Sequence, residues 1–350
     1  MKVLIVPDID PEKSNFLFTY RLIHLLEEKG HICIVSAPKK FSFSCTSYDA
    51  PTPRYKMFVE IGKSYEEWLF NSGRISLKYL RKDILSLSNC VSIEKPDLIL
   101  DLGRISAQII GRIHNIPYYS FVSSIYYREK TFNKDVLSQL NTVLSENGLE
   151  QILYIYDLYS YASKRISFSS SSVQLFQESN NVERYEIPLP IEIISKSPSV
   201  SLFFLHTDKD EIKLKRLIIE TFLNAPYKVE AYIPDIDEDV NKNIHFLEEP
   251  KLDSLSSNNV VIHDGEFYLY HACITLGIPQ IIINTGTPEA VYESSVTRRY
   301  GFGTTINEYE LSVASIYEAY RRVSSNDGYK KRAELARNEA NKFHPLDDLF

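Results

Sequence analysis

Two groups of polar residues follow apolar segments in the C-terminal half of the chain, and both could support chemistry. The first is His263-Asp264-Gly265-Glu266, which comes between the apolar run at 260–262 and a helix-length segment. The second is Glu289, which begins the next helix-length segment, with Glu293 one turn later. Helix N-termini attract anions, and carboxylates accept hydrogen bonds from hydroxyl groups. The same residues also fit a structural role, with Asp264 as an N-cap and the glutamates as first-turn acids.

Carboxylates also end the strand-like segments of the N-terminal half. Asp101 closes the run at 95–101, and Asp8 and Asp10 follow the opening run at 2–6. A carboxylate can act as a general base when partial burial raises its pKa toward neutrality. Asp8 and Asp10 are equally typical of ordinary turns, and that alternative stays open.

Short apolar runs alternate with helix-length segments along both halves of the chain. Strands are predicted at 2–6, 32–36, 95–101, 118–122, 201–205, 228–233, 243–247, 260–262 and 280–283, and helices at about 15–29, 106–114, 210–223 and 327–343. This alternation predicts doubly wound parallel sheets, and therefore the α/β class. A proline- and serine-containing stretch at 187–200 indicates a linker. We therefore predict two Rossmann-like domains, 1–190 and 191–350, that face each other across a cleft, with the last helix as a candidate to pack back on the first domain.

Length and composition exclude several classes of protein. The chain has 350 residues, which is enough for two domains. Its net charge of −7 is not typical of a nucleic-acid-binding protein, which carries an excess of basic residues. Its four cysteines show no metal-ligand spacing, so no metal site is expected. No signal peptide and no apolar run near ~20 residues is present, so we expect a cytoplasmic protein without a transmembrane segment. The first loop, at 7–14, lacks glycine, which argues against a dinucleotide cofactor.

The ordered set of motifs resembles the GT-B nucleotide-sugar glycosyltransferases, above all the UDP-glycosyltransferase and macrolide-glycosyltransferase group. The segment Asn259–Gly303 is similar to that group's strand, His-Gly-Gly-x-Gly-Thr turn, helix, Gly-Val-Pro, strand, Asp-Gln and helix ending in Gly-x-Gly. Pro96–Asp101 resembles its Pro-Asp-Leu-Val-x-Asp strand, and Glu249-Pro250-Lys251 resembles its Val-Pro-Gln loop. The resemblance covers nearly the whole chain and implies the GT-B architecture.

The resemblance implies a donor site in the C-terminal domain. His263, Asp264, Gly265 and Glu266 correspond to the turn that receives the diphosphate, although Glu266 stands where the group has a small residue. Two carboxylates beside a phosphate repel it unless a cation intervenes. Pro250 belongs to the loop that cradles the nucleotide base. Glu289 and Ala290 take the place of the Asp-Gln pair that holds the sugar, and Ala290 cannot replace the amide.

The resemblance also implies a base and an acceptor site in the N-terminal domain. The group's catalytic His corresponds to Asn15, which has no useful proton affinity. Asp101 corresponds to the Asp that orients this His, so we expect Asp101 to act as the base, with Asp8 as the second candidate. Tyr118, Tyr126 and Tyr127 lie where the group binds its acceptor, and such rings suit a planar or amphipathic molecule. They fit a tyrosine-rich core as well.

We therefore expect a glycosyltransferase that moves a sugar from a nucleoside diphosphate donor, such as a UDP-sugar, to a small or lipid-like acceptor. By resemblance the reaction is inverting, with no cofactor and no obligatory metal. A second hypothesis is a non-catalytic GT-B subunit that stabilises or activates a companion glycosyltransferase. The changes at Asn15, Glu266 and Ala290 are those expected once catalysis is no longer required. Nucleotide-sugar hydrolysis or epimerisation is a third hypothesis.

Overall fold

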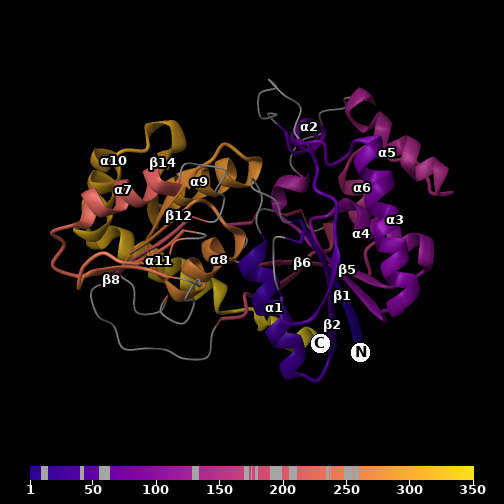
Figure 1. Ribbon diagram of the computed structural model, residues 1–350, viewed down its shortest axis with the longest axis horizontal. Coiled ribbons are helices and arrows are strands. Elements are labelled where there is room, and N and C mark those ends of the chain that lie inside the picture. The colour runs from indigo at the N-terminus through magenta and orange to yellow at the C-terminus, as the bar shows by residue number, and fades with distance from the viewer. Residues whose placement is uncertain are drawn as a thin grey trace.

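The protein folds into two α/β domains, each built on a sheet that is mainly parallel (Figure 1). The computed structural model describes residues 1–8, 15–39, 43–54, 64–127, 134–168, 173–174, 176–177, 180–189, 199–204, 211–233, 236, 238–247, 255 and 260–350. The predicted boundary near residue 190 and the nucleotide-loop residue Pro250 lie outside the described residues.

The first sheet has the strand order β15-β7-β6-β5-β4-β1-β2-β3, and its described pairs are parallel. Its strands are β1 (Lys2–Pro7), β2 (Ile32–Ala37), β3 (Thr46–Asp49), β4 (Leu98–Leu102), β5 (Tyr118–Phe121), β6 (Lys164–Phe168), β7 (Glu183–Glu186) and β15 (His344–Pro345). Both faces of the sheet are buried. Val3 and Ile5 of β1 join the apolar cluster on one face, and Leu4 and Val6 join the cluster on the other. This explains why β1 reads as a continuous apolar run.

The second sheet has the order β10-β11-β9-β8-β12-β13-β14 and is parallel except for the short pair of β10 and β11. Its strands are β8 (Ser199–Phe203), β9 (Lys228–Tyr232), β10 (Glu238–Asp239), β11 (Ile244–Phe246), β12 (Val260–His263), β13 (Gln280–Asn284) and β14 (Gly303–Asn307). In each sheet the strand order reverses beside the first strand of the domain, β1 or β8. Ligands of open α/β sheets bind beyond the carboxyl ends of the strands at such a reversal.

Helices cover the two sheets. In the first domain they are α1 (Phe16–Glu28), α2 (Tyr65–Asn71), α3 (Leu77–Glu94), α4 (Ile105–His114), η1 (Ser124–Tyr127), α5 (Lys134–Glu146) and α6 (Tyr156–Tyr159). In the second part of the chain they are α7 (Glu211–Phe222), α8 (Phe267–Leu276), α9 (Pro288–Tyr300), η4 (Glu308–Glu310), α10 (Val313–Ser324), α11 (Asp327–Ala340) and η5 (Leu346–Leu349). Serine side chains start three of them in the expected way: Ser64 caps α2, Ser76 caps α3 and Ser312 caps α10.

The two domains contact each other through α8 and α9. Helix α8 lies against α1, where the ring of Phe267 packs edge-on against Phe18. The Tyr268 hydroxyl donates a hydrogen bond of 2.7 Å to the Pro188 carbonyl oxygen. Helix α9 lies beside η1, and its Tyr292 hydroxyl donates to the Val173 carbonyl oxygen. These contacts place the N-termini of α8 and α9 next to the first domain.

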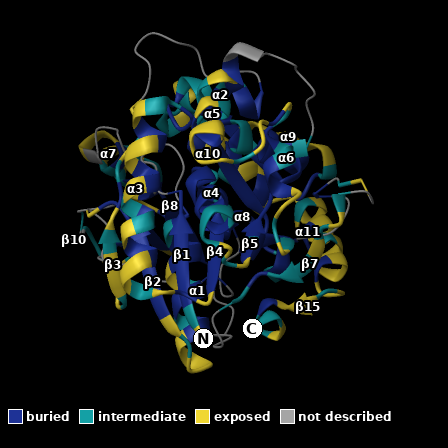
Figure 2. Cartoon of the chain, turned by 90° about the vertical axis from the view of Figure 1, so that its right-hand side faces the viewer, coloured by how far each residue is buried: buried dark blue, intermediate teal, exposed yellow. Residues whose placement is uncertain are grey.

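The end of the chain returns to the first domain. Helix α11 packs against α8 and α10 of the second domain. Beyond α11, β15 pairs with β7, so that the chain crosses between the domains a second time. Figures 1 and 2 show the two termini close together beside the first domain. Figure 2 also shows that β1, β4 and β5 are buried, while α3 and α11 expose their outer faces.

A buried ion pair connects α3 to the carboxyl end of β4. Arg104, just after β4, donates from Nε to Oδ2 of Asp83 on α3 over 2.9 Å. Its Nη1 also donates to the Ser36 carbonyl oxygen of β2 over 2.7 Å. Both side chains are almost fully buried. A buried charge is tolerated when it is paired and hydrogen-bonded, so each residue depends on the other.

We predict that Asp83→Asn lowers the free energy of unfolding by about 3–5 kcal/mol, because it leaves the Arg104 guanidinium buried without its counter-charge. Urea denaturation followed by circular dichroism measures this loss. Glu146→Gln is the matched control, since it removes a carboxylate from the exposed pair with Arg81. Equal shifts for the two variants would contradict the argument.

Candidate functional site

The candidate site lies between the domains, at the carboxyl ends of β1 and β12 and the N-termini of α8 and α9. We call it the interdomain site and define it by Asp8, Asn15 and Tyr65 of the first domain and Gly265, Glu266, Glu289 and Glu293 of the second. Burial raises the pKa of the Tyr65 hydroxyl well above its usual value. The neighbouring tyrosines, and then Glu289 and Asp8, raise this pKa further, so Tyr65 lies within electrostatic reach of carboxylates from both domains.

Asp8 is held in place by a buried arginine. Its Oδ2 atom accepts a hydrogen bond of 2.9 Å from Nε of Arg74, and only 5% and 4% of the two side chains is exposed. The Arg74 guanidinium lies over the Trp68 ring, 4.1 Å from its centroid. Trp68 in turn stacks on Tyr65, with 5.7 Å between the ring centroids. Helix α2 and the turn after it therefore orient the carboxylate that ends β1.

Asn15 uses its side chain to join the ends of two strands. Its Nδ2 donates to the Leu102 carbonyl oxygen over 2.7 Å and to the Asp8 carbonyl oxygen over 3.4 Å. The residue precedes α1 but makes no side-chain cap hydrogen bond. An amide in this position cannot take up a proton, and here it fixes the backbone instead.

Asp101 lies near the end of β4, and its side chain holds the turn that leads into α4. Its Oδ1 accepts from the backbone N–H groups of Gly103 and Arg104, and its Oδ2 accepts from the side chains of Gln108 and Ser120. The side chain has no exposed surface. Burial raises its pKa to about 6, although the four hydrogen bonds act in the opposite direction. Both carboxylate oxygens are therefore engaged inside the protein, and the role of Asp101 as the base stays a prediction.

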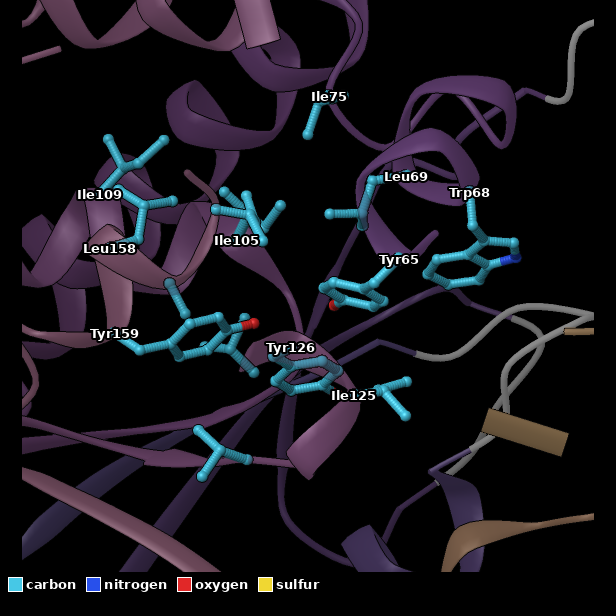
Figure 3. Packing of buried hydrophobic residues seen from close by; sticks show 14 of the residues in the cluster. Tyr65, Trp68, Leu69, Ile75, Ile105, Ile109, Ile125, Tyr126, Leu158 and Tyr159 are labelled. Carbon is cyan, nitrogen blue, oxygen red and sulfur yellow. The ribbon is translucent and has the colours of Figure 1, made fainter. Parts of the chain in front are cut away.

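The tyrosines expected to bind an acceptor differ in their surroundings. Tyr126 is buried in a row of rings, 4.2 Å from Tyr65 and 5.2 Å from Tyr159 between centroids (Figure 3). Tyr118 is also buried, and its ring lies close against Gly111 of α4. Tyr127 is partly exposed. Tyr118 and Tyr126 therefore both make packing contacts, and the acceptor role of Tyr118, Tyr126 and Tyr127 stays a prediction.

His263 ends β12 with both ring nitrogens in contact with the protein. Its Nε2 lies 2.7 Å from Oε1 of Gln280, and its Nδ1 accepts from the Gly265 N–H over 3.2 Å. These partners require the neutral tautomer with the proton on Nε2. The ring is fully buried, so it shapes the turn between β12 and α8.

Glu266, and not Asp264, is the N-cap of α8. Its Oε2 accepts from the Leu269 N–H over 2.9 Å. The structural role expected for Asp264 was therefore assigned to the wrong acid, and Asp264 lies buried in the turn before the cap. As a result, a carboxylate of the chain itself occupies the start of α8, the place where the resemblance puts a diphosphate.

Glu289 and Glu293 follow on α9, close to this turn. Gly265 has a φ of +80°, and a Cβ atom there would lie 3.3 Å from Cβ of Ala290 and 3.7 Å from Oε2 of Glu293. Burial raises the pKa of Glu293 well above its usual value, and the charges of Glu289 and Glu266 add to this rise. In the part of the chain that the structure describes, no set of three or more His, Cys, Asp or Glu residues is arranged to hold a metal ion.

Solved structures of similar shape identify the fold. The chain superposes over 100% of its length on 98% of "Spinosyn Rhamnosyltransferase SpnG complexed with spinosyn aglycone", with a TM-score of 0.74 and 14% identity. It also superposes over its full length on 98% of the glycosyltransferase SsfS6 of Streptomyces sp. SF2575 complexed with thymidine diphosphate, with a TM-score of 0.71 and 16% identity. The fold is GT-B. No protein-family model and no curated protein matches the sequence.

The GT-B fold explains why the interdomain site gathers residues from both halves of the chain, since the carboxyl ends of its two sheets meet there. The sequence analysis names Asp8, Asn15, Glu266 and Glu289 as candidates, and it does not name Tyr65 or Arg74, the arginine that holds Asp8. Tyr65 and Arg74 both lie in the segment at 64–76. No helix among the described residues is long and apolar enough to cross a membrane.

We predict that Asp101→Asn gains stability relative to the natural protein as the pH rises. The Asp101 carboxyl titrates at 3.8 when unperturbed and at about 6 when folded. The folded protein therefore binds a proton that the unfolded chain releases, and the stability from Asp101 is lost as the pH rises through this window. Between about pH 4 and pH 7 the variant gains about 3 kcal/mol relative to the natural protein. Urea titrations at several pH values measure this gain, and a constant difference would contradict it.

Proposed function

We propose that the protein is a glycosyltransferase that moves a sugar from a nucleoside diphosphate sugar to a small-molecule or lipid-like acceptor. The observation that carries the proposal is the complete GT-B fold with buried carboxylates from both domains at its interdomain site. SsfS6 and VinC have been solved in complex with thymidine diphosphate and dTDP, respectively, and SpnG with spinosyn aglycone. These complexes support a nucleotide donor and an acceptor for the present chain.

The reaction we propose is a direct displacement at the anomeric carbon. The acceptor oxygen forms a bond to this carbon while the bond to the nucleoside diphosphate breaks, and a base takes the acceptor proton. The configuration at the anomeric carbon is thereby inverted. Glu289 accepts hydrogen bonds from the sugar hydroxyls, and the N-terminal end of α8 lies next to the diphosphate. We propose that no metal ion takes part, so a chelator leaves turnover unchanged.

We assign the role of base to Asp8. It ends β1 at the point of strand reversal and is oriented by Arg74 from the side of the first domain. Tyr65 couples electrostatically to both Asp8 and Glu289, which supports a location of Asp8 near the sugar. Asp101 is the poorer candidate because four donors engage both of its carboxylate oxygens.

Two features of the site keep the second hypothesis, a non-catalytic GT-B subunit, as the alternative to be tested. Glu266 caps α8 with its own carboxylate, and Asn15 replaces a base with an amide that binds backbone carbonyls. A donor diphosphate must bind beside a negative charge at this helix start, which weakens its binding. The two hypotheses differ in whether a nucleotide binds, and this decides between them.

We predict that at least one of UDP, TDP and GDP, or a sugar conjugate of it, raises the melting temperature of the protein. A ligand at 100 times its dissociation constant stabilises a folded protein by about 2.7 kcal/mol. Glu266→Gln keeps an oxygen to cap Leu269 and removes the charge, so it should bind the same nucleotide about tenfold tighter. Unchanged affinity would place the diphosphate away from α8. If a folded sample binds no nucleotide, the companion hypothesis is favoured, and a second glycosyltransferase should co-purify in equal amount.

We predict that Asp8→Asn lowers turnover of the donor by about 10²- to 10⁴-fold, since a general base contributes a factor of this size. Hydrolysis of the donor, with water in place of the acceptor, provides an assay before the acceptor is known. Asp101→Asn is the matched control and should retain turnover within a few-fold. Circular dichroism must show that Asp8→Asn is folded, because Arg74 loses its counter-charge in this variant. Loss of turnover in Asp101→Asn alone would return the role of base to that residue.

A further inference from the structure

Exposed basic residues gather at the amino edge of the second sheet. Strand β13 leads into α9 and β14 leads into α10, so both helices run back along the sheet and end at its amino edge. Helix α11 begins at the same edge, because only residues 325 and 326 separate it from α10. Figure 1 shows α10 on the side of the second domain that is far from the first. We define the basic patch by the exposed cations at these three helix ends: Arg298, Arg299, Arg321, Arg322, Lys330, Lys331 and Arg332.

Helix packing brings the members of the basic patch together. Gly301 follows α9 with a φ of +69°, and a Cβ atom there would lie 2.9 Å from Cδ of Arg332. The start of α11 therefore lies against the end of α9, and α11 also contacts α10. Across the stretches 294–302 and 319–332, Asp327 is the only acid. The basic patch is thus strongly positive, although the whole chain has a net charge of −7.

The stability of the helices does not explain the basic patch. Within the described part of the chain, no ion pair joins any of its seven cations to a carboxylate. Other exposed cations do have such a partner, as Arg81 has Glu146. The helix dipole favours arginines at the C-terminal ends of α9 and α10, but it gives no such benefit to Lys330 and Lys331 near the start of α11. Like charges that lie this close together repel one another.

We propose that the basic patch binds the anionic headgroups of a phospholipid bilayer, so that the protein attaches to a membrane surface without crossing it. Five of the seven cations are arginines, whose planar guanidinium groups bind phosphate through paired hydrogen bonds. A cluster of this size near an anionic bilayer is sufficient for attachment, since each basic residue contributes to the affinity.

Exposed apolar side chains share helix faces with the cations. Tyr317 lies one turn before Arg321 on α10, and 51% of it is exposed. Leu335 lies one turn after Lys331 on α11, and 64% of it is exposed. Residues four positions apart lie on the same side of a helix. Apolar side chains beside basic ones suit the interfacial region of a bilayer, where the apolar groups enter and the cations meet the headgroups.

Other anionic partners fit the basic patch less well. A protein partner typically meets an apolar centre surrounded by a polar rim, whereas cations make up most of this surface. Proteins that bind nucleic acid present a helix or strand to a groove, or aromatic rings that stack on bases. The basic patch consists of helix ends instead, and a bilayer can contact several helix ends at once.

Membrane attachment through the basic patch leaves the interdomain site accessible. The patch lies at the amino edge of the second sheet, whereas the site lies at the carboxyl ends of β1 and β12. The inference therefore goes beyond the proposed function and does not depend on it. A lipid-like acceptor is compatible with attachment, but binding to the bilayer is expected whether or not a sugar is transferred.

The test is co-sedimentation of the full chain with vesicles. We expect vesicles of phosphatidylcholine with about 30% phosphatidylglycerol to bind the protein about tenfold or more tightly than vesicles of phosphatidylcholine alone, at about 0.1 M salt. Salt at about 0.5 M should abolish the difference, because it screens exposed charges. Equal binding to both kinds of vesicle, or binding to neither, would overturn the inference. This holds even if the protein binds an acidic protein or a nucleic acid.

Paired variants test whether the basic patch is responsible. Lys330→Gln combined with Lys331→Gln should weaken binding to the anionic vesicles about 10- to 30-fold, since each basic residue near such a surface contributes about fivefold. Lys78→Gln combined with Lys82→Gln is the matched control, because it removes two exposed lysines from α3 of the first domain. The control should change binding by less than about threefold.

A second pair keeps the test independent of one helix. Arg321→Gln combined with Arg322→Gln alters the patch from α10 and should weaken vesicle binding to a similar extent. Melting curves establish that each variant folds. Unchanged vesicle binding in both patch variants, or an equal loss in the α3 control, would refute the role of the patch. Nucleotide binding should be the same in all variants, so a protein that prefers anionic vesicles but binds no nucleotide would refute the proposed function alone.

Discussion

The pairing of buried charge is the constraint on which the organisation of this protein depends. In the first domain every buried carboxylate discussed above is compensated: Asp8 and Asp83 by an arginine each, and Asp101 by four hydrogen-bond donors. These bonds fix the carboxyl ends of β1 and β4 against α2, α3 and α4. In the second domain Glu293 is buried to a similar degree, and its Oε2 has no hydrogen-bond partner among the described residues. The two faces of the interdomain site therefore differ in how a buried carboxyl is held: arginine and several donors hold Asp8 and Asp101, whereas burial raises the pKa of Glu293 and favours its neutral form.

Backbone geometry brings these two faces together. Gly265 adopts a left-handed conformation, so the turn after β12 can approach α9 more closely than a residue with a side chain allows. The contacts of α8 with α1 and of α9 with η1 then hold the starts of both helices beside the first domain. The return of β15 to β7 adds a second covalent connection between the domains. The turn at Gly265 and the contacts of α8 and α9 with the first domain thus place Glu289 near Tyr65, although neither residue makes these contacts itself.

The sequence predicts much of this fold but less of the site. Strands such as β1, β4 and β12 are buried on both faces, so their continuous apolar runs are recognisable without a structure. The segment at 64–94 was not recognised, although Ser64 and Ser76 cap its helices. Arg74 and Tyr65 come from this segment and contact Asp8 and its surroundings only in the tertiary structure, and no local pattern encodes such a contact. Asp101 illustrates the opposite problem, because its place at a strand end fits a base and a turn equally well, and only its four donors distinguish them.

The departures from the motifs of glycosyltransferases fall into two groups with different meanings. Asn15 and Glu266 stand where the resemblance places groups that face a ligand, but both bond to the chain itself. The Asn15 side chain donates to the Leu102 carbonyl oxygen, and the Glu266 carboxylate accepts from the Leu269 N–H. Such side chains form hydrogen bonds within the protein, so fewer groups remain to bind a donor. Glu293 does the reverse, because it adds a buried acid whose Oε2 the described chain leaves without a partner.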